Sequence, residues 1–252
     1  MFDKTVPQIE LPNAILIDGH ISIGAQDFGL IADSERVDPD TPAERVVELM
    51  KEKLPPQTRL RIAAVLHRDT WSPMLKNVGR LLGPDNVFLA VPADRWSPGA
   101  SGLYVRTPEQ RVQCRDRLDG IRAVMLDLEG LGESVLEDFH NLVADHPAVP
   151  FVFASLGGRF WRFAMLLACR FDHVYLDTVH LTRRRLRSMF ANRYQLARFL
   201  WRLQDRIIFG SGFPVMQSAS VLHILLPWCR DAGMVRKIVQ TNGERVFFGV
   251  KK

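Results

Sequence analysis

Seven short apolar runs, separated by longer amphipathic segments, place the tightest limit on how this chain can fold. Each run is rich in Val, Ile, Leu or Phe, which is typical of strands covered on both faces within a parallel sheet. The runs comprise residues 14–18, 60–66, 87–91, 121–126, 149–154, 173–176 and 206–209. Because the pattern continues along the whole chain, it predicts one domain spanning residues 1–252.

The segments between these runs carry signals for the start of a helix. Thr41-Pro-Ala-Glu44 and Thr107-Pro-Glu-Gln110 each place a capping hydroxyl before a proline, with an acid or amide three residues on. Ser134-Val-Leu-Glu137 is a third capping box. Strands that alternate with helices predict βαβ units and a parallel sheet. An open doubly wound sheet and a closed (β/α) barrel both fit, although no glycine-rich fingerprint of a dinucleotide fold follows the first run.

Composition indicates the kinds of partner and the cellular compartment that suit the protein, but it says little about activity. The formal charge of +5 and the pI of about 9.4 are compatible with acidic ligands or partners. No apolar run has membrane-spanning length, and the first residues lack the pattern of a signal peptide. The three cysteines are scattered without CxxC spacing. We therefore expect a cytoplasmic protein with reduced thiols and no membrane partner.

Four stretches resemble the amidohydrolase-2 family, and they occur in the family's order across nearly the whole chain. They are Ile15-Leu-Ile-Asp-Gly-His-Ile-Ser22, Pro150-Phe-Val-Phe-Ala-Ser-Leu-Gly-Gly158, Asp205-Arg-Ile-Ile-Phe-Gly-Ser-Gly-Phe-Pro214 and Asn242-Gly-Glu-Arg-Val-Phe-Phe-Gly249. The resemblance implies an α/β fold, a TIM-like (β/α) barrel. Seven runs stand in place of eight strands, so either one strand escapes the pattern or a βα unit has been lost and the barrel is incomplete. The family's additional histidine strand is not recognised, as if its unit were deleted between Leu128 and Ser134.

The resemblance also implies a metal at the barrel mouth, yet most of its ligand positions have changed. His20 matches the first histidine, whereas Ser22 replaces the second and Ser155 replaces another ligand histidine. Gly212 stands where the family has the aspartate that serves as general base. A hydroxyl is a poor ligand for zinc or manganese, and glycine offers no side chain. We therefore expect a divergent member with no metal and no cofactor.

Polar residues still follow the predicted strands, at the end that faces the site in such barrels. The catalytic candidates are His20, Asp18, His67 and Asp177. The candidates for binding a ligand are Ser22, Ser155, Ser211, Gly212, Asp127, His180, Arg183, Arg184 and Arg185. Structural explanations compete with each of these roles. His20 and Asp18 fit a structural pair better than a catalytic one, His67 fits a packing role, and Asp127 with Glu129 fits helix capping.

The most unusual segment, residues 181–204, holds seven arginines and no acidic residue. Because guanidinium groups bind carboxylates and phosphates in a bidentate manner, this segment predicts an anion-binding rim or a docking surface for an acidic protein. A solvated helix face explains the arginines equally well. Nucleic acid is disfavoured because no aromatic binding motif accompanies them. A homo-oligomer is compatible with the sequence.

Three hypotheses about function follow. The favoured one is a non-catalytic barrel that has lost its metal and binds a ligand or partner. The second is a metal-independent hydrolase of the lactonase type, acting on an anionic carboxylate substrate with His20 and the arginines. The third is a metal-dependent hydrolase or decarboxylase whose rearranged site uses His67, His180 and Asp177.

Overall fold

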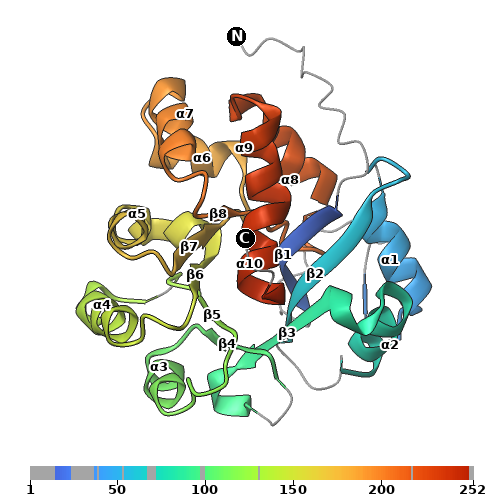
Figure 1. Cartoon of the computed structure of the whole chain (residues 1–252), viewed down its shortest axis with the longest axis horizontal. Helices are drawn as coiled ribbons and strands as arrows, with labels where there is room; N and C mark the ends of the chain where they lie inside the picture. Colours follow the sequence, from blue (N-terminus) through green and yellow to red (C-terminus); the bar gives the residue numbers. More distant parts are fainter. Residues whose placement is uncertain are drawn as a thin grey trace.

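Eight parallel strands form the barrel, and each strand pairs with its neighbour in the sequence (Figure 1). The computed structural model describes residues 15–23, 37–38, 40–52, 54–66, 72–96, 100–129, 131–216 and 218–249. The strands are β1 (Ile15–Ile23), β2 (Arg59–Leu66), β3 (Val87–Pro92), β4 (Gly102–Val105), β5 (Ala123–Leu126), β6 (Phe151–Phe153), β7 (Val174–Asp177) and β8 (Ile207–Ile208). The order β1 to β8 confirms the predicted TIM-like barrel and excludes the doubly wound sheet.

The first and last strands meet through a close approach of their backbones. The amide of Gly19 donates to the carbonyl of Phe209 at 2.7 Å. A Cβ atom on Gly19 would lie 2.5 Å from Cγ2 of Ile208 and 2.8 Å from the oxygen of Phe209. Only a glycine leaves room for this contact, which brings the two ends of the sheet together.

The count of seven strands is wrong, and of the two alternatives the missed strand is the correct one, because the structure contains β4 as an additional strand. Gly102–Val105 pairs with β3 on one side and with β5 on the other. Its four residues are too short and too mixed to stand out as an apolar run. Gly102 is required where it stands, since a Cβ there would come within 2.3 Å of the Phe88 ring. The predicted loss of a unit between Leu128 and Ser134 is therefore also wrong.

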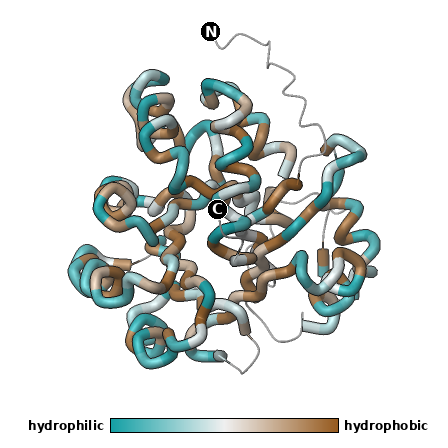
Figure 2. The backbone as a smooth tube through the Cα atoms, in the orientation of Figure 1, coloured by the Kyte–Doolittle hydropathy of each residue, from teal (hydrophilic) through white to brown (hydrophobic). Residues whose placement is uncertain are grey.

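Most of the helices surround the strands as an outer ring, whereas the last helix lies across the centre of the barrel in this view (Figure 1). The helices are α1 (Ala43–Lys51), α2 (Ser72–Leu82), α3 (Pro108–Arg115), α4 (Leu136–Asp145), α5 (Trp161–Arg170), α6 (Arg183–Met189), α7 (Arg193–Arg202), α8 (Ser218–Leu225), α9 (Ala232–Arg236) and α10 (Asn242–Phe248). Hydrophobic residues gather along the strands and the inner helix faces, and hydrophilic residues face outward (Figure 2). Within the described ranges, no helix combines the length and the apolar character needed to cross a bilayer.

One of the three predicted capping boxes is confirmed. The hydroxyl of Thr107 accepts from the amide of Gln110, whose side chain in turn caps the amide of Thr107. The other two are wrong. Helix α1 begins after Pro42, and Thr41 instead accepts from the amide of Asp38. Helix α4 begins after Val135, because residues 133–135 form a short 3₁₀ turn before it.

Helix α10 closes the end of the barrel where the strands begin. Phe247 lies among the residues inside the barrel, with its ring centroid 4.9 Å from that of Phe88. The side chain of Asn242 donates to the carbonyls of Gln204 and Ile207, both at 2.7 Å. The aromatic plug and these two hydrogen bonds leave the opposite end, where the strands finish, as the mouth.

We predict that Phe247→Ala lowers the free energy of unfolding by about 3–5 kcal/mol, because it empties a fully buried site inside the barrel. Urea denaturation followed by circular dichroism measures the change. Leu166→Ala serves as the control, since that side chain is 62% exposed, and it should change stability by about 0.5 kcal/mol or less. Equal effects of the two substitutions would contradict the packing of α10 into the barrel.

Candidate functional site

The carboxylate of Asp18 is fully buried and joins β1 to the segment after β8. It accepts from the amide of Ser211 at 2.8 Å and from the hydroxyls of Ser211 and Ser218. Its neighbours Leu16 and Ile21 belong to the layer between strands and helices, and Asp18 reaches α8 on the same side. The hydroxyl oxygen of Ser211 also accepts a hydrogen bond from the amide of Phe213 at 3.0 Å. Asp18 and Ser211 therefore hold the barrel ends and do not line the pocket described below.

Asp177 plays a similar part between β6 and β7. Its Oδ1 atom accepts from the amides of Ser155 at 2.9 Å and Val179 at 3.0 Å. The hydroxyl of Ser155 donates to the carbonyl of Val179 at 2.8 Å. Ser155 and Asp177, predicted separately as site residues, are thus brought together as a buried link between two mouth loops.

The loop after β6 has an unusual left-handed backbone over four successive residues. The φ angles are 55° at Ser155, 56° at Leu156, 91° at Gly157 and 58° at Gly158. The left-handed conformation costs roughly 1–2 kcal/mol for a residue with a side chain. A Cβ on Gly157 would lie 2.4 Å from Cβ of Ala164, so glycine is required for packing as well. This turn directs the chain sharply from the strand to Arg159 and α5.

Asp127 faces the interior of the barrel and is held by several groups. The hydroxyl of Tyr104 donates to it at 2.9 Å, and Nε of Arg106 lies 3.7 Å away. Its second oxygen accepts from the amide of Glu129 at 2.9 Å. Burial raises the pKa of Tyr104 well above its usual range, and the nearby Asp127 raises it further. Tyr104 therefore stays protonated as the donor to Asp127 over the physiological range.

The ring of His180 covers Gly212. A Cβ on Gly212 would come within 2.5 Å of both Cε1 and Nδ1 of the imidazole. Gly212 has a φ of 77°, and His180 itself has a φ of 54°. Non-glycine residues held in this conformation concentrate at functional sites. The position where the resemblance implies an aspartate therefore has no room for a side chain while His180 keeps this place.

Three predicted residues cannot be placed by their side chains. His20 and Ser22 belong to β1, but their side chains lie outside the description, and His67 lies outside the described residues. In the part of the chain that the structure describes, no group of three or more His, Cys, Asp or Glu residues could hold a metal ion. Of the positions implied by the resemblance, Ser155 donates its hydroxyl to a carbonyl and Gly212 is bare. The described donors do not fit the family's metal.

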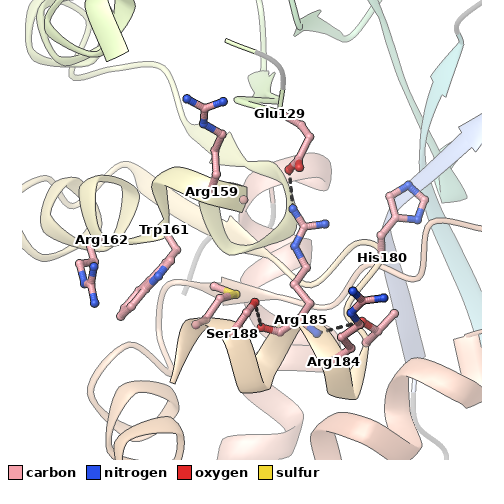
Figure 3. Close-up of a pocket in the computed structure, with 11 residues that line it drawn as sticks. Glu129, Arg159, Trp161, Arg162, His180, Arg184, Arg185 and Ser188 are labelled. Atoms are coloured by element: carbon pink, nitrogen blue, oxygen red, sulfur yellow. Dashed lines mark hydrogen bonds and ion pairs between the residues drawn. The ribbon is translucent and has the colours of Figure 1, made fainter. Parts of the chain in front are cut away.

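A pocket of about 750 Å³ opens beside these loops. Figure 3 shows Arg185 near its centre, with Arg159 and Glu129 on one side and His180 on another. The lining comprises Glu129, Gly158, Arg159, Trp161, Arg162, His180, Thr182, Arg184, Arg185, Ser188 and Met189. Its volume falls in the range of about 300–1,000 Å³ that is usual for small-molecule sites.

The pocket is strongly basic. Four arginines line it against a single glutamate, and Glu129 forms an ion pair with Arg185. Trp161 forms part of the wall and packs against Phe190 with ring centroids 5.0 Å apart. An excess of guanidinium groups in a concave site attracts anions and offers them bidentate hydrogen bonds.

Of the residues predicted to bind a ligand, Arg184, Arg185 and His180 line this pocket together. Arg183 is exposed and lies outside the lining. Arg159 and Arg162 were missed, because they follow a different strand and belong to no basic run. The Gly157-Gly158 pair was the available signal, since a glycine turn after a strand often shapes a binding loop. Trp161 packs against Phe190 and also lines the pocket.

We predict that Gly212→Ala lowers the free energy of unfolding by about 2–4 kcal/mol, because a left-handed alanine is strained and its methyl group collides with the His180 ring. Thermal and urea denaturation measure the change. Adding His180→Ala should recover the part due to the collision, since contacting residues are not additive.

Gly249→Ala is the matched control for this substitution. Gly249 has a φ of 67°, but nothing lies within 4 Å of its Cβ position. Gly249→Ala should therefore lower the free energy of unfolding only by the cost of the left-handed backbone, about 1 kcal/mol. If Gly212→Ala and Gly249→Ala lower the free energy of unfolding equally, or if adding His180→Ala restores none of the loss, the collision with the His180 ring does not occur.

Part of the chain matches a known protein family, and solved structures share its fold. The model of the amidohydrolase family matches residues 130–249. An amidohydrolase from Burkholderia multivorans with bound zinc has a similar fold, with a TM-score of 0.61 and 16% identity, over 93% of this chain and 99% of that one. No curated protein sequence matches the chain.

Two further solved structures share the fold. A probable 2-pyrone-4,6-dicarboxylic acid hydrolase from Acinetobacter baumannii, with citric acid bound, has a TM-score of 0.61 at 13% identity, over 94% of this chain and 100% of that one. A dihydroxybenzoic acid decarboxylase from Polaromonas sp. JS666, with bound manganese and an inhibitor, has a TM-score of 0.52 at 13% identity, over 92% and 96% of the two chains. At these identities, the likeness is one of fold.

Proposed function

We propose that this barrel, whose residues 130–249 match the amidohydrolase family model, binds a small carboxylate-bearing molecule in the arginine pocket, and that it does so without that family's metal. The observation that carries the proposal is that four arginines from two separate segments line one pocket. Arg159 lies just before α5 and Arg162 in its first turn, whereas Arg184 and Arg185 lie in the first turn of α6.

The chemistry of these groups favours a carboxylate. A guanidinium group offers parallel N–H donors that match the two oxygens of a carboxylate, and such pairs are stronger than neutral hydrogen bonds. Within the described residues, Glu129 is the one carboxylate paired with an arginine of this pocket. The remaining guanidinium groups favour an anion supplied by a ligand.

Names of proteins with a similar fold guide the choice of ligand to test. One is a probable hydrolase of a pyrone dicarboxylic acid with citric acid bound, and another is a dihydroxybenzoic acid decarboxylase. Both names refer to carboxylic acids. Citrate is therefore a reasonable first probe for this pocket.

The proposed absence of a metal rests on the donors at the strand ends. Ser155 uses its hydroxyl on the carbonyl of Val179, and Asp177 accepts two backbone amides. Gly212 has no side chain, and the imidazole of His180 takes its space. Open metal sites usually need three protein ligands. His20 and His67 are left as the residues on which a rearranged site would depend.

Metal-independent hydrolysis is the second candidate, and the position of His180 favours it. Its imidazole lines the pocket together with the arginines, so a bound carboxylate substrate would lie near a group able to transfer protons. Turnover of a lactone that carries a carboxylate, lost in His180→Gln while binding persists, would favour this candidate over simple binding.

A cytoplasmic location belongs to the same proposal. All three cysteines are unpaired, with Cys114 buried, Cys229 partly buried and Cys169 exposed. Burial raises the pKa of Cys114 and of Cys229 to about 12, which keeps both thiols protonated and unreactive. Free thiols of this kind persist in reducing compartments.

We predict that citrate binds to the purified protein and that Arg184→Gln weakens binding by about tenfold or more, the usual effect of losing a charge-assisted contact. Isothermal titration calorimetry at low ionic strength measures the affinity. Arg183→Gln is the matched control, because that neighbouring arginine is exposed and lies outside the pocket. Equal losses in both variants would refute a role for this pocket, and so would the absence of binding.

We also predict that the protein, expressed in medium supplemented with zinc, manganese and iron, purifies with far less than one metal ion per chain. Elemental analysis by mass spectrometry measures the content. One ion per chain that survives dialysis, and that is lost in His20→Ala or His67→Ala, would overturn the proposed metal independence.

A further inference from the structure

The central arginine of the pocket already holds a carboxylate from the chain itself. Arg185 forms an ion pair with Glu129 through its Nη2 atom and the Oε2 atom of the carboxylate (Figure 3). The two residues lie 56 positions apart and come from the loop after β5 and from α6. Their meeting is therefore a product of the barrel and not of local sequence.

The loop after β6 leaves room for this ion pair at Gly158. A Cβ on Gly158 would lie 2.7 Å from Oε2 of Glu129 and 3.3 Å from Nη2 of Arg185. Gly158 also has a φ of 58°, which suits glycine. Because Gly158 has no side chain, the carboxylate of Glu129 and the guanidinium group of Arg185 can meet next to its backbone.

The two partners differ in how far they are exposed to solvent. The side chain of Arg185 is 25% exposed, whereas that of Glu129 is 53% exposed. The backbone of Arg185 is hydrogen-bonded within α6, since the hydroxyl of Thr182 accepts from its amide and the hydroxyl of Ser188 donates to its carbonyl. The amide of Glu129 donates to Asp127. Because the carboxylate is the more exposed partner, it has more room than the guanidinium group to turn toward solvent.

We infer that Glu129 is an internal substitute for the ligand's carboxylate, and that the pocket selects molecules with two or more carboxylates. This inference rests on the proposed function. One ligand carboxylate replaces Glu129 on Arg185, an exchange of like for like that gains little. A second carboxylate reaches Arg159 or Arg184, which pair with no carboxylate in the described part of the chain. Net affinity therefore comes from the second group, and a monocarboxylate binds poorly.

The test compares citrate, which has three carboxylates, with acetate, which has one, by calorimetry on the full chain. Glu129→Gln keeps the shape of the side chain but removes its charge, so it should tighten citrate binding by about threefold to fivefold, the scale of losing one exposed ion pair. Acetate should bind the unaltered protein at least about tenfold more weakly than citrate, because it lacks the second contact.

A double-mutant cycle separates direct exchange from a general change in charge. In the Arg185→Gln background, Glu129→Gln should leave citrate affinity nearly unchanged, because the competed arginine is gone. Glu133→Gln is the matched control, an exposed carboxylate four positions on that does not line the pocket. It should change affinity little. Glu129→Asp retains the charge and should not tighten binding.

Several results would overturn the inference. The inference fails if Glu129→Gln binds citrate no better than the unaltered protein does, or if it tightens citrate binding equally in the Arg185→Gln background. If this happens while Arg184→Gln still weakens binding, the proposed function stands and only the internal substitute fails. If neither the unaltered protein nor Glu129→Gln binds citrate, the inference fails together with the proposed function.

Discussion

The joint between the first and last strands is the interaction on which the rest of the structure depends. A carboxylate as deeply buried as Asp18 is costly unless hydrogen bonds replace its water. Here the segment after β8 and the start of α8 supply them through Ser211 and Ser218. The amide of Gly19 adds a direct backbone contact across the same joint. Every mouth loop starts from a strand end, so the closed joint determines where all of them lie.

This arrangement divides the polar residues of the mouth into two groups. Asp18, Asp177 and Asp127 use their oxygens on amides and hydroxyls of the barrel itself. Their role is to hold loops in place. The groups left to meet a ligand lie on the loop after β6 and on α6, where the arginines converge beside His180. Within the described residues, the charged groups that line the pocket thus lie beside the strand ends, on the loop after β6 and on the adjoining helices.

The errors made from sequence have physical causes. Strand β4 was missed because Gly102 must be small beneath the Phe88 ring, so the strand lacks an unbroken apolar run. Two capping boxes failed because the hydroxyl of Thr41 found another partner and a 3₁₀ turn displaced the start of α4. The box at Thr107 formed because α3 begins directly after it, so that the hydroxyl of Thr107 accepts from the amide of Gln110 and the side chain of Gln110 accepts from the amides of Arg106 and Thr107.

What the sequence determined by itself was the alternation of strands and helices, the parallel sheet that follows from it, and the concentration of arginines in residues 181–204. These depend on the spacing of residues along the chain, which hydrophobic burial converts directly into secondary structure. Only the tertiary structure decided that Arg159 and Arg185 line the same pocket, that Glu129 pairs with Arg185 across the mouth, and that His180 fills the space above Gly212. These contacts join different βα units, and their distances depend on how the closed barrel places its loops, which no local pattern encodes.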